Sequence, residues 1–401
     1  MSGSGEHAAQ AAREGPLQGL RVLELARILA GPWAGQLLAD LGADVIKVER
    51  PGAGDDTRQW GPPFVTGADG ADLGAAYYHS CNRGKRSVAV DIGTPEGQAR
   101  VRALAAGADV LVENFKVGSL VRYGLDAASL RAANPRLIYC SITGFGQDGP
   151  YAHRAGYDFI VQGMGGIMSI TGEPDGPPQK GGVAHADLFT GVYAAVAILA
   201  ALEQRHRTGE GTHIDMALLD TQVAVLGNQA LSWMTNGRVP HRMGNGHVAL
   251  APYQSFPTAD GDVIVAVGND RQFARLCEVL GISALAGDPR FATNPGRVTN
   301  RGALIALIAA PIACRTSADL LAALEAVGVP AGPINTIDQV FADAQVVARG
   351  MELSVEGADG ERLPGLASPI VFDGVRATHS RASPRLGEDK DAGWLTDPER
   401  E

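Results

Sequence analysis

The sequence predicts an α/β protein whose core is a parallel sheet covered by helices on both faces. Two observations lead to this class. Strand-like runs alternate with helix-like runs along the chain, and the strand-like runs are rich in apolar residues. Strands that are apolar on both faces are typical of parallel sheets buried between two layers of helices.

The first strand–helix–strand unit lies near the N-terminus. The run LRVLEL, residues 20–25, predicts a short buried strand, and a loop with a helix over roughly residues 32–41 follows it. DVIKVER, residues 44–50, is the next strand. A strand, a helix and a parallel strand within about 30 residues form a βαβ unit.

The pattern recurs further along the chain. RSVAVDI, residues 86–92, predicts a strand, and the helix after it opens at Thr94 with Pro95 at the first helical position. Two more strands are predicted at DVLVENF, residues 109–115, and at RLIYCSITGFG, residues 136–146, with a short helix between them. These repeats predict a doubly wound sheet.

The pattern changes after Leu219. Residues from about 225 to 330 combine the strand-like VIVAVGN with the helical stretches RQFARLCEVLG and SADLLAALEAVG, which predicts a smaller α/β domain. About the last 60 residues alternate between strand-like and loop-like segments.

Composition excludes several classes of function. The net charge of −10, without a face dense in Lys and Arg, argues against a nucleic-acid partner, although a local basic pocket is compatible with it. The four cysteines are far apart and form no CxxC motif, as in a cytoplasmic protein with reduced thiols. The longest apolar run, residues 188–202, is shorter than the roughly 20 residues of a membrane span. The N-terminus lacks the apolar stretch of a secretory signal. We therefore expect a cytoplasmic protein without a membrane segment.

The common motifs of cofactor and nucleophile chemistry are missing. The chain has no GxxxxGK[ST], no GxGxxG after the first strand and no GxSxG. His241 and His247 are six residues apart, which fits no metal motif. We expect no metal.

Asp187 stands in GGVAHADLFTG, between a glycine pair and a long apolar run. An Asp at such a place most often caps a helix by accepting hydrogen bonds from free N–H groups. The alternative is a chemical role, and the dipole of a helix over residues 187–205 would keep the carboxylate ionised for it. His185 is a candidate neighbour, although side chains two residues apart on a turn usually diverge.

Arg50 and Arg122 follow the ends of two predicted strands. Ligands of such sheets bind at the carboxyl ends of the strands, and a guanidinium group bonds phosphate through two N–H groups. The two arginines therefore either bind a phosphorylated ligand or pair with acidic residues on the surface.

Six blocks in order resemble one family. They are LRVLELARILAGPWAGQLLADLGADVIKVERPGAGDDTR, NRGKRSVAVDI, LVENFKVGSLVRYG, GYDFIVQGMGG, TGEPDGPP and GGVAHADLFTG. Together they resemble the class III coenzyme A-transferases, a family that includes formyl-CoA transferase, the carnitine CoA-transferases and the α-methylacyl-CoA racemases. The resemblance extends from about residue 16 to PRLGE near residue 385.

The resemblance implies a fold and an assembly. Family members are interlocked homodimers, in which each chain has a Rossmann-like large domain, with a parallel sheet built from both termini, and a small domain between. Carried over to this chain, the large domain covers residues 17–222 and 334–401, the small domain covers residues 223–333, and residues 1–16 are a disordered tail.

The resemblance also implies a site. The family's catalytic aspartate matches Asp187, and the glycine loop that covers the site matches Gly244, Asn245 and Gly246. The positions that contact coenzyme A match Leu29, Ala30, Arg50, Asn114, Phe115, Arg122, Tyr157 and Asp158. Gly93 stands where formyl-CoA transferase has a lysine, so that one phosphate contact is lost or comes from Arg83, Lys85 or Arg86.

Tyr157 favours a transferase over a racemase. The racemases have histidine here, because moving an α-proton requires two acid/base groups, and tyrosine with its ordinary pKa of about 10 is a poor base. The resemblance implies that Asp187 exchanges acyl groups through an anhydride and an aspartyl-CoA thioester. It is greatest to the branch that uses succinyl-CoA with dicarboxylic acceptors; α-methylacyl-CoA racemase is the alternative.

Overall fold

The computed structural model describes residues 15–67 and 70–395. Apart from its last two residues, the expected disordered tail lies outside this range. The chain forms two compact units. The first contains the residues up to Ile167, Gly181–Ala230 and the residues from Ala344 onward, and the second contains Met168–Lys180 and Leu231–Asp343.

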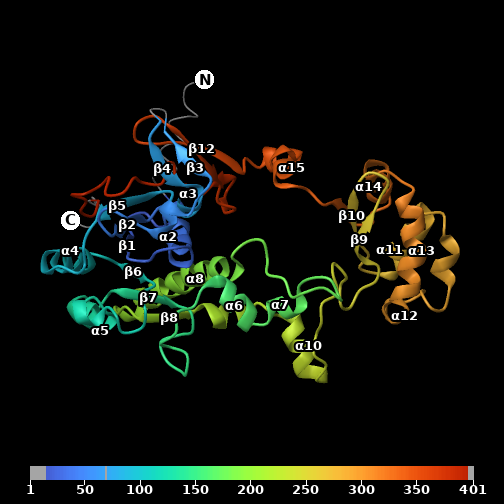
Figure 1. The fold of residues 1–401 in the computed structure, drawn as a ribbon, viewed down its shortest axis with the longest axis horizontal. Coiled ribbons are helices and arrows are strands. Elements are labelled where there is room, and N and C mark those ends of the chain that lie inside the picture. The colour runs from blue at the N-terminus through green and yellow to red at the C-terminus, as the bar shows by residue number, and fades with distance from the viewer. Residues whose placement is uncertain (1–14, 68–69, 396–401) are drawn as a thin grey trace. The chain divides into compact units, whose positions relative to one another are not determined.

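A six-stranded sheet forms the centre of the first unit, in the order β5-β2-β1-β6-β7-β8 (Figure 1). Every neighbouring pair in it is parallel, which confirms the predicted α/β class. The strands are β1 Arg21–Glu24, β2 Asp44–Glu49, β5 Lys85–Ala89, β6 Val110–Glu113, β7 Ile138–Thr143 and β8 His213–Ala217. The strand order changes direction at β1, with β2 and β5 on one side of it and β6, β7 and β8 on the other.

Helices cover both faces of this sheet. The helices that the site depends on are α2 Ala30–Asp40, α4 Pro95–Ala106, α5 Ala127–Ala133, α6 Asp158–Met164, α8 His185–Thr208 and α9 Leu218–Ala224. Helices α2 and α8 share a core with Val22, whereas α4 and α5 share one with Leu23, its neighbour in β1. Successive side chains of a strand point to opposite faces, so β1 contributes an apolar side chain to the core on each face.

Helix α4 begins as predicted. Pro95 is its first residue, and the side chain of Thr94 accepts a hydrogen bond of 3.0 Å from the N–H of Gly97.

Helix α8 is longer than the predicted 187–205. Its 24 residues make it the one helix of the described chain that is long and apolar enough to span a membrane. Half of that apolar window is buried inside the protein, in the core it shares with α2 and the sheet. This burial is typical of the central helix of a folded domain.

The prediction that both termini build the parallel sheet is wrong. The C-terminal segment belongs to the first unit but forms separate antiparallel ribbons. They are β12 Glu352–Glu356 with β13 Arg362–Leu366, and β14 Val371–Phe372 with β15 Val375–Arg376; β3 Phe64–Thr66 and β4 Asp72–Ala75 form a further ribbon. Residues in β12 alternate between exposed and half-buried, whereas a central parallel strand must be apolar on both faces.

The second unit has its own sheet and core. Its antiparallel strands are β9 Tyr253–Pro257, β10 Asp262–Ala266 and β11 Ala331–Pro333, in the order β11-β10-β9. Its main helices are α11 Asp270–Val279, α12 Asn294–Thr299, α13 Arg301–Ala313 and α14 Ser317–Ala326. Phe256, Phe273 and Phe291 are among the side chains buried between them.

Candidate functional site

The loops after β1 and β6 meet where the strand order changes direction. Asn114, which follows β6, accepts a hydrogen bond of 2.9 Å from the N–H of Arg27, and its amide donates one of 2.6 Å to the carbonyl of Arg27. Open α/β sheets bind their ligands at such a switch point, outside the carboxyl ends of the strands. The two bonds hold the loops together there.

Ile28, in the loop after β1, has an unusual backbone. Its φ of +73° lies in the left-handed region, which is strained for a β-branched residue. The carboxylate of Asp55 accepts its N–H at 3.2 Å through both oxygens. The thiol of Cys81 donates a weak bond of 3.7 Å to its carbonyl. The surrounding structure therefore fixes this conformation directly before Leu29 and helix α2.

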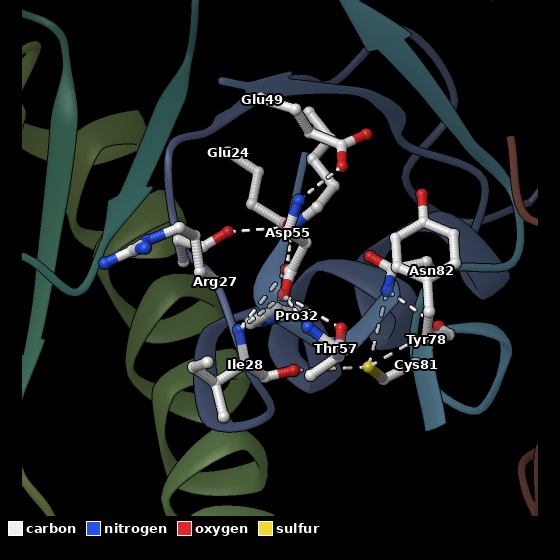
Figure 2. A network of polar contacts seen from close by, with 12 residues as sticks. Glu24, Arg27, Ile28, Pro32, Glu49, Asp55, Thr57, Tyr78, Cys81 and Asn82 are labelled. Carbon is white, nitrogen blue, oxygen red and sulfur yellow. Dashed lines mark hydrogen bonds and ion pairs between the residues drawn. The ribbon is translucent and has the colours of Figure 1, made fainter. Parts of the chain in front are cut away.

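A buried charge network supports Asp55 (Figure 2). Lys47 is fully buried and contacts Glu24 at 2.9 Å, Asp55 at 3.0 Å and the carbonyl of Ala26 at 2.8 Å. Burial disfavours its charge, but the carboxylates of Glu24, Asp55 and Glu49 outweigh this and raise the pKa of Lys47. Lys47 is therefore a permanent cation beneath the loop.

A cavity of about 380 Å³ opens at the switch point. It brings together six of the residues that the sequence predicts for the site: Leu29, Ala30, Asn114, Phe115, Tyr157 and Asp187. Leu29 and Ala30 are the N-cap and first residue of α2. The first N–H groups of a helix have no acceptor within it, so this end of the cavity suits negatively charged atoms.

Asp187 lies in the first turn of α8 and exposes only 9% of its surface. The prediction that it caps the helix is wrong, because α8 begins at His185 and Asp187 is its third residue. Asp158 of α6 has that role, since its carboxylate accepts hydrogen bonds from the N–H groups of Ala186 at 2.8 Å and of Asp187 at 3.4 Å. Because the Asp158 carboxylate caps α8, the Asp187 carboxylate is not needed as a cap and lies in the cavity wall.

Burial, with a smaller contribution from the charge of Asp158, raises the pKa of Asp187 to about 7. The expectation that the helix dipole keeps Asp187 ionised is therefore also wrong. Moving a carboxylate out of water costs more free energy than its interaction with a helix N-terminus gives back. Such a group is half protonated near pH 7 and changes its charge in the physiological range.

A second cavity, of about 270 Å³, contains Arg50 and Arg122. It shares Arg27, Phe115 and Ser119 with the first cavity, so the two cavities adjoin. Gly93 also lies in its wall. The three basic side chains here are therefore Arg27, Arg50 and Arg122.

The three residues expected to replace the lysine at Gly93 have other partners. Arg83 pairs with Asp40 at 2.6 Å, Lys85 with Glu24 at 2.8 Å, and Arg86 with Asp44. None of the three lines the second cavity. Lys85 and Arg86 lie in β5 and Arg83 lies just before it, and carboxylates of the same unit hold all three.

Two other predicted features lie outside the cavities. The ring of His185 lies against Gly181, where even a β-carbon would come within 1.9 Å of it. Gly244, Asn245 and Gly246 belong to the second unit, where the N–H of Gly244 donates to the carbonyl of Gly172 at 3.0 Å and Asn245 bonds to Ser255 at 2.9 Å.

Sequence reasoning missed several residues of the cavity. Lys116 and Arg154 line it beside the predicted residues. Lys116 directly follows the predicted Phe115, and Arg154 is three residues before Tyr157, so both could have been found as basic residues near predicted positions. The supporting roles of Lys47 and Asp55 had no signal in the sequence, because they depend on contacts between different strands and loops.

The sheet, the cavity at its switch point and the arginines at its strand ends define an α/β enzyme suited to a phosphorylated ligand. The chain belongs to CoA-transferase family III, whose model matches residues 17–390. This confirms the resemblance in the sequence.

Relatives of this chain are named as CoA-transferases. The chain is 59% identical over 376 residues to succinate–glutarate CoA-transferase of Agrobacterium fabrum, with 94% of each chain covered. It is 42% identical over 373 residues to human succinyl-CoA:glutarate CoA-transferase, covering 93% of this chain and 84% of the human one. A crystal structure of a CAIB/BAIF family protein from Brucella suis matches with a TM-score of 0.85 and 57% identity, covering 94% of this chain and 98% of that one.

Proposed function

We propose that this enzyme transfers CoA from succinyl-CoA to a dicarboxylic acid such as glutarate, with Asp187 as the nucleophile. The observation that carries the proposal is the buried carboxylate of Asp187 in the wall of the switch-point cavity. The names of the relatives support the choice of succinyl-CoA and a dicarboxylate. Tyr157, which lines the same cavity, supports transfer over racemisation.

The reaction exchanges one thioester for another. The Asp187 carboxylate attacks the thioester carbonyl, the C–S bond breaks, and an acyl–aspartyl anhydride and CoA thiolate result. The thiolate attacks the aspartyl carbonyl and releases the first acid, which leaves an aspartyl-CoA thioester. The acceptor carboxylate attacks the aspartyl-CoA carbonyl, the C–S bond breaks, and a second anhydride and CoA thiolate result. The thiolate then attacks the acyl carbonyl of this anhydride, which releases the new acyl-CoA and regenerates the Asp187 carboxylate. This is covalent catalysis, in which one difficult exchange becomes several easier steps.

Each of these steps passes through an oxyanion. We assign its stabilisation to the backbone N–H groups at Leu29 and Ala30, at the start of α2, because these residues line the same cavity as Asp187. The network of Lys47 and Asp55 fixes the preceding residue, Ile28. Donors that are already in place need no rearrangement when the charge develops.

CoA would occupy both cavities. We assign its phosphates to Arg50 and Arg122 in the second cavity and its thiol end to the first, because the two adjoin at Phe115. Calorimetric titration of the protein with CoA tests this assignment, and the absence of a saturable signal would contradict it.

We propose a homodimer, which the apolar surface of α8 supports. Phe189, Val192, Val196 and Leu199 are exposed on this helix, at the three- and four-residue spacings that place side chains on one helix face. A contiguous apolar surface of this kind marks an interface. Sedimentation velocity is expected to give twice the mass of one chain, and Val196→Glu is expected to shift it to the monomer. A monomeric, active wild-type protein would contradict the proposal.

Three further proposals follow from family membership. The chain's domains are expected to divide near residues 222 and 334 and to interlock between the two copies, and the 244–246 loop is expected to be the family's substrate loop. The enzyme is expected to work in the cytoplasm. A crystal structure of the dimer and fractionation of cells test these proposals.

An exchange assay in heavy water tests the function. Purified enzyme with succinyl-CoA and glutarate is expected to produce glutaryl-CoA and succinate, detected by mass spectrometry. A parallel reaction contains a 2-methylacyl-CoA. Deuterium in the 2-methylacyl chain without any exchange of acyl groups would mean that the enzyme is a racemase.

A further inference from the structure

A dicarboxylic substrate brings a second charge into the cavity. One carboxyl group reacts at Asp187, and the other stays ionised in a partly dry site, where it needs a cation. Three basic side chains line the switch-point cavity: Arg27, Lys116 and Arg154. Arg27 already pairs with Asp56 at 2.7 Å.

Arg154 is available for such a ligand. Its guanidinium lies over the rings of Tyr151 at 4.6 Å and Phe145 at 5.3 Å. Among residues 15–67 and 70–395, no acidic side chain forms an ion pair with it. Stacking on aromatic rings orients a guanidinium while its N–H groups remain able to bind a carboxylate through two hydrogen bonds.

Arg154 belongs to the segment that leads to Asp158, and it lines the same cavity as Asp187. Asp158 bonds to the N–H groups at the start of α8, so this segment ends next to the backbone of Asp187. Arg154 is four residues before Asp158, and Tyr157 and Gly156 of the same segment line the cavity. Lys116 instead follows Phe115, where the cavity adjoins the one that contains Arg50 and Arg122.

We propose that Arg154 binds the unreacting carboxylate of both the acyl group and the acceptor acid, and so selects dicarboxylic substrates. This inference rests on the proposed function. In the proposed mechanism the leaving and the entering acid occupy the same place beside Asp187 in turn, so one cation serves both. No acidic side chain of the described residues competes for the Arg154 guanidinium, so either acid can pair with it.

The test compares dicarboxylic with monocarboxylic substrates. In Arg154→Gln, kcat/KM for glutarate with succinyl-CoA is expected to fall about 10- to 100-fold, the value of a charge-assisted pair of hydrogen bonds. Butyrate with propionyl-CoA, a pair that lacks the second carboxylate, is expected to give butyryl-CoA and propionate at the same low rate in wild type and variant. Arg154→Lys is expected to restore part of the preference, because it keeps the charge but loses the two-bonded geometry.

Lys116→Gln is the matched control, since Lys116 is another basic side chain of the cavity and no acidic residue of the described chain forms an ion pair with it. An equal loss with both classes of acid in Arg154→Gln would mean a structural role and would overturn the inference, as would a loss of the preference in Lys116→Gln alone. A wild-type enzyme that exchanges only monocarboxylic acids would also overturn it and leave CoA transfer intact. A wild-type enzyme that exchanges no acid would instead refute the proposed function. Thermal unfolding of each variant shows that it is folded.

Discussion

Asp187→Asn is expected to abolish CoA transfer, with kcat reduced by about 10⁴-fold or more, as for other lost nucleophiles. The amide has almost the shape of the carboxylate but cannot attack a thioester. The packing at the start of α8 should persist, because Asp158 rather than Asp187 binds its N–H groups. The expected loss is therefore one of chemistry and not of folding.

The pKa of Asp187 adds a second result to the same variant. An unfolded Asp loses its proton near pH 3.8, whereas Asp187 in the folded protein keeps it until about pH 7. Between these values the folded state binds more protons, so the free energy of unfolding falls as pH rises. Above pH 7 Asp187 is ionised, and the folded state bears the full free-energy cost of this buried charge. Asp187→Asn is expected to remove it and to be more stable than wild type at pH 8 by a few kcal/mol, on the order set by the shift.

Both results can be measured on one preparation. The exchange assay gives activity, and urea unfolding at pH 5 and pH 8 gives stability; kcat/KM of the wild type is expected to rise with pH up to about 7. Asp220→Asn, an exposed acidic residue in the first turn of α9, is the matched control. Residual transfer above 1% of wild type in Asp187→Asn would show that another group is the nucleophile.

Lys47→Met is expected to destabilise the first unit by about 3–5 kcal/mol, the usual effect of leaving a buried charge without its partner. Lys47 and the side chains of Glu24 and Asp55 are completely buried, and its removal leaves Asp55 without its cation. The same carboxylate holds Ile28 in its strained conformation. Lys47→Met protein that still folds should therefore also lose activity, because the loop before α2 is no longer held in its conformation.

Urea unfolding of wild type and Lys47→Met measures this effect. The comparison variant is Arg290→Met, which removes the cation of a surface pair, Arg290 with Asp288 at 2.7 Å. Surface pairs contribute about 0–1 kcal/mol, so this variant should unfold almost as wild type does. The double variant Lys47→Met with Asp55→Asn separates charge from packing, and it should recover part of the lost stability. A loss below 1 kcal/mol in Lys47→Met would mean that the network does not support the loop.

The sequence alone determined the class of fold and most of the elements that carry the site. Runs such as LRVLEL and DVIKVER carry apolar residues on both faces, which is typical of buried parallel strands, and Thr94 with Pro95 marks a helix start by local chemistry. The expectation that the C-terminal segment joins the parallel sheet came from the resemblance and was wrong, because β12 and β13 form a separate two-stranded sheet.

The tertiary structure decided the burial, the hydrogen-bond partners and the pKa of each site residue. Asp187 looked like a helix cap, but the cap comes from Asp158, and the burial that raises the pKa of Asp187 comes from the packing of several helices around it. Lys47 and Asp55 are separated from Ile28 in the sequence, yet they fix its conformation. A pKa and a strained loop depend on contacts between distant parts of the chain, whereas strands and helix starts depend on neighbouring residues, and only the latter can be recognised before the chain is folded.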